Sequence, residues 1–379
     1  MSGEEHASGE ICAMLEEHGH EVRWFKKSTA GLEEETIKKI KAFFNGIYHP
    51  SIRKEIAPIL DEYKPDVVMV QNLYPFISSA VFKPIKDRKI PVVMRCPNYR
   101  LFCPNGLCLN SKGEVCEACW SGMHEWNEVR NNCDKSIKKS IGYAARNAFN
   151  RITGMIRKNV DCFIVQSEFQ KQKFISQGID SDHIGILAGI LPDIGKVEER
   201  PIGDWVSFVG RASFEKGLDE FIEAARELSD IPFKVAGNID ERYVIPKDIP
   251  ANLEFVGFKK GDELNEFYQD SRIICVPSKW YEGFPNVILR AMLLDRPTVT
   301  TNIGAMQSIV DDHVNGLLVK PADSYELTRA IAELYPNKEL CLQYGKAGHE
   351  KADRLYSREQ IYKDLMGIFE QAIDNNKKR

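Results

Sequence analysis

The chain has 379 residues, more than one hydrophobic core usually organises, so two domains are the default expectation. Its formal net charge of −4 at pH 7 lacks the basic excess of nucleic-acid-binding proteins, so no nucleic-acid partner is expected. It has no apolar run of transmembrane length and no signal-peptide pattern, which favours a cytoplasmic location where its ten cysteines stay reduced.

The first half of the chain alternates helical and extended patterns. Residues 7–17 place apolar side chains at helical spacing, and residues 21–25 have the composition of a strand after the turn at His18-Gly19. Further strands are predicted at residues 66–70, 90–94, 161–165 and 184–187. Because strands that alternate with helices favour a parallel sheet, we expect an α/β first domain, with bounds at residues 1–195.

A cysteine-rich loop occupies residues 96–133 of this domain. It is poor in large apolar residues and contains Cys103, Cys116, Cys119 and Cys133. A Cys-x-x-Cys pair with two further cysteines has the spacing of a structural zinc site, and four thiolates suit a closed tetrahedral site. The alternative is a set of free, buried thiols, and the sequence leaves both interpretations open.

A basic amphipathic helix is predicted near residues 136–158. Its apolar stripe consists of Ile137, Ile141, Ala145, Phe149, Ile152 and Ile156. Such a stripe most often faces a core. A basic helix of this kind also suits an anionic membrane surface, so peripheral membrane contact is the second interpretation.

The second half of the chain repeats the alternating plan. Residues 189–204, with Pro192 and Gly195, are typical of a linker. A second domain is predicted over residues 200–355, with strands near residues 206, 233, 253, 273, 298 and 316–319. A final helix is predicted at residues 358–373, within a last segment of residues 357–379.

Two segments of the second domain have the pattern of anion sites. In the first, a buried strand at residues 205–209 precedes a glycine loop with Arg211 and Lys216, and a helix follows. In the second, a strand at residues 272–276 is followed by a turn through Gly283 and a helix. Backbone N–H groups at such a helix start bind phosphate, although the blander interpretations are an ordinary strand–helix turn and solvated charges.

Glu282 stands just outside the second turn. An acidic residue beside a phosphate site usually accepts hydrogen bonds from hydroxyl groups. A sugar nucleotide carries both a phosphate and hydroxyls, so this segment predicts a sugar-nucleotide site.

The second segment also resembles a known family. Six residues keep the register of its Ser-x-x-x-Glu-Gly-Phe-Pro run, namely Ser278, Glu282, Gly283, Phe284, Pro285 and Val287. With the Gly-Arg…Glu-Lys-Gly loop, these residues resemble the retaining glycosyltransferases of family 4, glycosyl transferases group 1. The resemblance implies an α/β GT-B fold, in which two Rossmann-like doubly wound domains face each other across a cleft. The run from Asn98 to Gly106, with the cysteines that follow it, is similar to one branch of that family.

The resemblance further implies roles for individual residues. Arg211 and Lys216 would contact the diphosphate of the donor, and Glu282 would orient its sugar. The donor-binding residues would be Gly210, Gly283, Phe284, Asn286, Val287 and Arg290. The donor would be a nucleotide-diphosphate sugar, used without a catalytic metal, and the acceptor a glycan or a lipid-linked glycan in cell-surface polysaccharide synthesis. The first domain would bind the acceptor, and the last helix would cross back onto it.

Several positions depart from the family pattern. Pro97 stands where the branch has a histidine, Arg290 where the family has a second glutamate, and Ser308 where it often has a glutamate. Arg290 is expected either to bind phosphate or to pair with Glu282. The first strand of the family would precede Met1, so we expect an N-terminally shortened chain or a misassigned start. These departures favour an alternative function, a degenerate member that binds a nucleotide or glycan without turnover.

Overall fold

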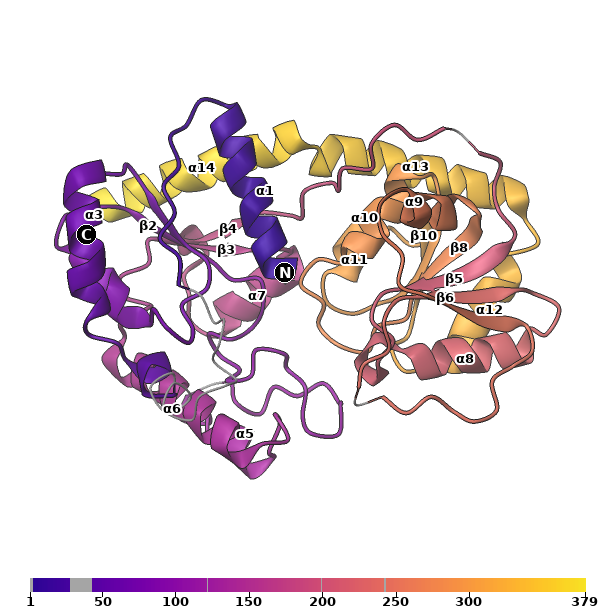
Figure 1. Cartoon of the computed structure of the whole chain (residues 1–379), viewed down its shortest axis with the longest axis horizontal. Coiled ribbons are helices and arrows are strands. Elements are labelled where there is room, and N and C mark those ends of the chain that lie inside the picture. The colour runs from indigo at the N-terminus through magenta and orange to yellow at the C-terminus, as the bar shows by residue number, and fades with distance from the viewer. Residues whose placement is uncertain (1–2, 28–42, 121, 199, 242) are drawn as a thin grey trace. The chain divides into compact units, whose positions relative to one another are not determined.

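The computed structural model describes residues 3–27, 43–120, 122–198, 200–241 and 243–379. The chain divides into two compact units (Figure 1). The first comprises Met1–Leu187 together with Tyr362–Arg379, and the second comprises Ala188–Ile361.

The first unit contains a parallel four-stranded sheet. Its strands, in their order across the sheet, are β1 (Val68–Val70), β2 (Val92–Arg95), β3 (Cys162–Val165) and β4 (Ile184–Ile186). The helices around it are α1 (Gly3–Glu17), α3 (Ile52–Tyr63), η1 (Ser79–Val81), α4 (Phe82–Lys86), α5 (Asn127–Arg130), α6 (Ile137–Thr153), α7 (Glu168–Ser176) and η2 (Ser181–His183). All residues of β2 and β3 are buried, as expected for parallel strands that are covered on both faces.

The second unit contains a parallel six-stranded sheet with the order β10-β9-β8-β5-β6-β7. The strands are β5 (Trp205–Val209), β6 (Phe233–Ala236), β7 (Leu253–Gly257), β8 (Ser271–Val276), β9 (Thr298–Thr301) and β10 (Gly316–Val319). The helices are η3 (Phe214–Lys216), α8 (Leu218–Glu227), α9 (Gly261–Gln269), α10 (Asn286–Leu293), α11 (Met306–Ile309), α12 (Ser324–Leu334) and α13 (Lys338–Tyr356).

The side chains of β8 show how this sheet is buried on both faces. Ile273 and Cys275 belong to one buried cluster, with residues of α8 and α12, whereas Ile274 and Val276 belong to another, with residues of α10 and α11. Successive strand residues point to opposite faces, so the two clusters lie on the two faces of the sheet.

The last helix, α14 (Arg358–Lys377), packs on the sheet of the first unit from Tyr362 onward. The Tyr362 ring stacks on His18, with 3.6 Å between ring centroids. Gly185 of β4 leaves room for Ile368, because a Cβ on that glycine would lie 2.5 Å from the Ile368 Cγ1 atom. The buried Asn375 donates to the carbonyls of Asp161 and Asp182, which fixes the end of the helix.

All the predicted strands form except the one at residues 21–25, which is extended but belongs to neither sheet. A strand needs a free sheet edge to satisfy its backbone groups, and this segment lies along α3 instead. The Tyr63 hydroxyl donates to the Glu21 carbonyl at 2.6 Å, and Arg23 pairs with Glu62. Trp24 is therefore exposed instead of buried. The strand that was expected before Met1 lies outside the described residues.

In helix α6, several residues of the predicted apolar stripe are exposed and polar residues are buried. The helix ends at Thr153, where Gly154 adopts the left-handed conformation, short of the predicted residue 158. Ile137, Ile141 and Ile152 are exposed by 50%, 39% and 72%, so the expectation that the whole stripe faces a core was wrong. Polar residues are buried in their place, namely Arg146, Asn147 and Asn150. In the part of the chain that the structure describes, no helix is long and apolar enough to cross a bilayer.

Candidate functional site

Two loop–helix junctions of the second unit emerge from the same edge of its sheet. Strands β5 and β8 are parallel neighbours, with Phe208 opposite Cys275, so the loops after them must also be neighbours. The Lys279 N–H donates to the Glu215 carbonyl at 2.8 Å, which joins the two loops directly.

Gly217 permits the close approach of these loops. Its φ of +76° lies in the left-handed region, and a Cβ at this position would come within 1.9 Å of the Pro277 carbonyl oxygen. Only glycine meets both requirements. The junction between the two loops therefore depends on backbone contact.

Glu282 is the centre of the site. Its Oε1 atom accepts hydrogen bonds from Lys216 Nζ at 2.5 Å, Ser278 Oγ at 2.8 Å and Trp280 Nε1 at 2.9 Å. The residue is 7% exposed. Lys216 comes from the first loop and the other donors from the second, so this carboxylate holds both loops together.

The environment of Glu282 keeps it ionised. Burial raises the pKa of this carboxyl, but the charge of Lys216 and the hydrogen bonds from Lys216, Ser278 and Trp280 outweigh burial and lower the pKa below its ordinary value. A carboxylate in this state accepts hydrogen bonds and is a poor proton donor. It therefore suits contact with sugar hydroxyls better than general acid catalysis.

The loop after β9 supports Glu282 from a third side. Gly304 has a φ of +62°, and a Cβ there would lie 3.1 Å from the Glu282 nitrogen. In the second loop, the buried Lys279 pairs with Glu220 at 3.1 Å and lies over the Phe214 ring. Sequence reasoning did not give Trp280, Lys279 or Gly304 a role. Two features of the sequence could have indicated these roles, namely Trp280 two residues before Glu282 and Gly304 after β9.

Arg211 lies at the rim of the site with carboxylate partners of its own. Its guanidinium pairs with Glu215 at 2.7 Å and Asp240 at 3.1 Å, and its side chain is half exposed. A diphosphate would have to compete with these carboxylates for the guanidinium. Gly210 directly follows β5, and Gly237 directly follows β6. A Cβ added to Gly237 would lie 1.8 Å from the Gly210 carbonyl oxygen, so the ends of β5 and β6 are also close together.

Helix α10 begins directly after the second loop, at Asn286, and no side chain caps it. Its first N–H groups lack partners within the helix, as at any helix start, and can receive an anion. Asn286 is exposed, and Gly283 and Val287 are half-buried around this start. The Phe284 ring packs on Tyr356, with 5.3 Å between ring centroids, so this side chain belongs to the hydrophobic core.

Arg290 does not pair with Glu282. Its guanidinium donates to Asn265 of α9, and burial lowers its pKa below the ordinary value. The hydrogen bonds of Glu282 come from Lys216, Ser278 and Trp280 instead. The predicted pairing of Arg290 with Glu282 was therefore wrong.

The cysteines of the loop at residues 96–133 are free thiols. Cys103 is hydrogen-bonded to Cys108, a residue outside the predicted zinc set of Cys103, Cys116, Cys119 and Cys133, and this contact lowers the pKa of Cys103. Burial raises the pKa of Cys119 to about 12, so this thiol is protonated. No three His, Cys, Asp or Glu side chains within the described ranges are placed to hold a metal ion, so the donor set does not fit zinc in this conformation.

Comparison with known proteins adds a family match. Residues 195–351 match the model of the family described as "Glycosyl transferases group 1". The matched segment is less than half of the chain. A protein of Klebsiella pneumoniae, described as an uncharacterized 42.6 kDa protein in the cps region, is 26% identical over 281 residues, covering 72% of this chain and 67% of that protein. The capsular polysaccharide biosynthesis glycosyltransferase CapM of Staphylococcus aureus is 24% identical, covering 43% of this chain and 45% of CapM.

For three further curated relatives, the match spans slightly less than half of the relative's own length. Among solved structures, Anabaena Alr3699/HepE in complex with UDP superposes with a TM-score of 0.62, covering 95% of this chain and 89% of that chain at 14% identity. At this identity the likeness concerns the fold alone. The two parallel-sheet α/β units match structures of the GT-B type, as the sequence predicted.

Proposed function

We propose that this chain, which carries a glycosyl transferases group 1 domain over residues 195–351, transfers a sugar from a nucleotide-diphosphate donor to an acceptor hydroxyl. The observation that carries the proposal is the Glu282 carboxylate, which is ionised, buried and shared by two loop–helix junctions. These junctions supply the cations and helix start that a diphosphate requires, next to an acceptor of hydroxyl hydrogen bonds.

In this proposal the donor diphosphate lies between the start of α10 and the first loop. The N–H groups near Gly283, Asn286 and Val287 would bind one phosphate, and Lys216 and Arg211 would neutralise the charge that develops as the diphosphate leaves. Lys216 would then be shared between Glu282 and the phosphate. Arg211 would exchange its carboxylate partners for the phosphate oxygens.

We propose that the reaction retains the anomeric configuration. The acceptor oxygen attacks the anomeric carbon from the face that the diphosphate leaves, the C–O bond to the phosphate breaks, and a phosphate oxygen takes the proton of the acceptor. Neither a protein nucleophile nor a catalytic metal is needed. Glu282 would hold the sugar hydroxyls, a role that agrees with its lowered pKa.

The acceptor is proposed to be a glycan or a lipid-linked glycan of polysaccharide synthesis. The name of CapM supports that setting. Exposed Ile137, Ile141 and Ile152 on α6, beside the exposed Lys138 and Lys139, support peripheral contact with an anionic membrane. Co-sedimentation with anionic vesicles tests this contact, and an unchanged supernatant with both anionic and neutral vesicles contradicts it.

A thermal-shift panel tests the donor site. Uridine, guanosine, adenosine and cytidine diphosphates are added separately, and the matching nucleotide raises the melting temperature by mass action. Turnover of the corresponding nucleotide sugars, with and without a chelator, then separates a transferase from a protein that only binds. Binding without turnover of any donor would favour the degenerate, non-catalytic alternative.

A further inference from the structure

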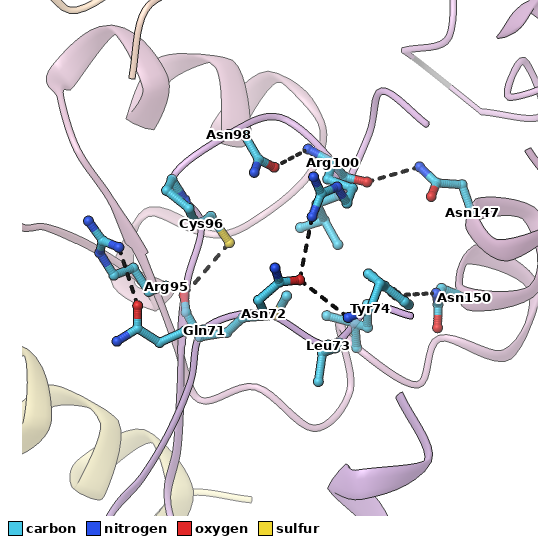
Figure 2. Close-up of a pocket in the computed structure, with 14 residues that line it drawn as sticks. Gln71, Asn72, Leu73, Tyr74, Arg95, Cys96, Asn98, Arg100, Asn147 and Asn150 are labelled. Atoms are coloured by element: carbon cyan, nitrogen blue, oxygen red, sulfur yellow. Dashed lines mark hydrogen bonds between the residues drawn. The ribbon is translucent and has the colours of Figure 1, made fainter. Parts of the chain in front are cut away.

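A hollow whose lining includes several amide and arginine side chains lies in the first unit, away from the Glu282 site in the chain. It opens where β1 and β2 end and is lined by Gln71 to Tyr74, which follow β1, and by Arg95 to Asn98, which begin at the last residue of β2 (Figure 2). Its volume is about 510 Å³, which includes space open to solvent. In open α/β sheets, ligands bind outside the carboxyl ends of the strands, so this hollow has the position of a binding site.

Amide side chains hold the backbone at the mouth of the hollow. Asn98 Oδ1 accepts from the Arg100 N–H at 3.0 Å, and Asn147 Nδ2 donates to the Arg100 carbonyl at 3.0 Å. Among the described residues, the Arg100 guanidinium contacts only Asn72 Oδ1, at the long distance of 3.5 Å (Figure 2). Its backbone is thus fixed, while its charged end is only weakly engaged.

A buried oxygen in the lining lacks a partner. Asn150 is 9% exposed, and its Nδ2 atom donates to the Tyr74 hydroxyl at 2.9 Å. Its Oδ1 atom is buried and accepts no hydrogen bond from the described residues. A buried polar atom without a partner is costly, so this position favours a ligand that brings a hydrogen-bond donor.

A second arginine lies directly behind the lining. Arg146 is 4% exposed, and its guanidinium lies 4.4 Å from the centre of the Tyr74 ring. Burial, together with the positive charge of Arg100, lowers the pKa of Arg146 to about 10. Among the described residues, no carboxylate pairs with Arg100 or Arg146. As far as the described residues extend, the positive charges of Arg100 and Arg146 are therefore not compensated by a carboxylate.

We propose that this hollow binds an oxyanion carried by the sugar acceptor, with Arg100 in direct contact and Arg146 supplying charge from behind Tyr74. The inference rests on the proposed transferase function and adds the chemical class of the acceptor. An oxyanion contributes the negative charge that the hollow lacks, whereas a neutral sugar leaves both cations uncompensated. The anion is either a phosphate ester or the carboxylate of an acidic sugar. A hydroxyl on the same acceptor can donate to Asn150.

Binding of small acceptor fragments tests the proposal. The full chain is titrated with methyl phosphate, methyl glucuronide and methyl glucoside, with the donor site filled by the nucleoside diphosphate that stabilises the chain most. The melting temperature reports binding. One of the two anions is expected to bind in a salt-sensitive way, and the neutral glucoside at least about tenfold more weakly. Which anion binds identifies a phosphorylated or an acidic acceptor.

Matched variants assign the effect to the hollow. Arg100→Gln is expected to weaken anion binding by about tenfold or more, and Arg100→Lys by less, because lysine keeps the charge but loses the planar fork. Arg130→Gln removes an exposed arginine outside the hollow and serves as the control. If Arg100→Gln does not fold, Asn72→Asp places a carboxylate beside Arg100 and must abolish anion binding.

Two results overturn the proposal. The first is equal binding of methyl glucoside and both anions, or no binding of any fragment at concentrations up to about 100 mM, near the weak end of fragment affinities. The second is unchanged anion binding in Arg100→Gln. Failure of the proposed transferase function is a separate result, because no nucleoside diphosphate would then shift the melting temperature. The fragment titrations can still be run without nucleotide, so they test the hollow independently.

Discussion

The Glu282 site and the Arg100 hollow use the same place in two similar sheets but opposite electrostatics. At the Glu282 site each charge has a partner: Lys216 pairs with Glu282, Arg211 with Glu215 and Asp240. In the hollow, the guanidiniums of Arg100 and Arg146 have amide and carbonyl partners but no carboxylate in the described residues. Within the described ranges, the charges of the first arrangement are paired without a ligand, whereas those of the second have no anionic partner.

The two regions are also built differently. The Glu282 site depends on backbone approach, at Gly217 and Gly304, with three donors on one carboxylate oxygen. The hollow is shaped by amide side chains such as Asn98 and Asn147. Backbone approach tolerates no added atom, so substitutions at the Glu282 site should cost more than substitutions around the hollow.

Gly217→Ala should have the largest effect. The added methyl group would lie 1.9 Å from the Pro277 oxygen, and alanine is strained at a φ of +76°. We expect the free energy of unfolding to fall by about 3 kcal/mol or more, as measured by urea denaturation. Gly367→Ala is the control, because this exposed residue of α14 has open space around it, and should be neutral or slightly stabilising. Equal stability of both variants would show that the loops are not in contact.

Glu282→Gln should abolish most of the activity with little effect on the shape of the site. The amide keeps the size of the side chain but loses the charge that holds Lys216 and accepts from sugar hydroxyls. We expect kcat/KM for sugar transfer to fall by about a hundredfold, equivalent to about 2.7 kcal/mol. Glu254→Gln, at an exposed glutamate of the same unit, should leave transfer unchanged. Full activity of the Glu282 variant would remove this residue from the mechanism.

The strands and helices of the two junctions around Glu282 could be predicted from the sequence because they are local. Each junction is a short apolar run, a glycine loop and a helix, and these signals lie within about twenty residues of each other. The contact between Lys216 and Glu282 is not local, since it depends on β5 and β8 being neighbours. Only the resemblance to a family brought these two residues together at the sequence level. The partner of Arg290, on α9, could not be foreseen for the same reason.

Sequence patterns did not predict which part of the fold a segment packs against. In α6 the apolar spacing was helical, but Arg146, Asn147 and Asn150 are buried instead of the isoleucines. A pattern shows that a helix has two faces and does not show which face meets the fold. Residues 21–25 had strand composition, but this segment lies along α3 and pairs with no strand of either sheet.

Lys216→Met separates the charge of Glu282 from its burial. In the wild type the pKa of Glu282 is lowered in the folded state, so its contribution to stability is present above the ordinary carboxyl value of 4.5 and is lost as the pH falls through the lowered value. In the variant, burial without a cation should raise the pKa, so the folded state would gain stability as the pH falls. We expect a loss of about 2 kcal/mol near pH 7 that shrinks toward pH 5, as measured by urea denaturation at each pH. A loss that is independent of pH would contradict the coupling between Lys216 and Glu282.

Arg290→Glu should give the smallest effect and tests the departure from the family pattern. A carboxylate can accept hydrogen bonds from the ribose hydroxyls of a nucleotide, whereas a guanidinium only donates. We expect the affinity for uridine or guanosine diphosphate to rise about fivefold, equivalent to about 1 kcal/mol, as measured by calorimetry. Arg290→Gln is the matched control, because it also removes the charge and the hydrogen bond to Asn265 but supplies no carboxylate. Should both variants bind the nucleotide equally well, or the glutamate variant more weakly than the wild type, residue 290 does not meet the ribose, and the nucleotide must be held by Lys216 and the start of α10 without it.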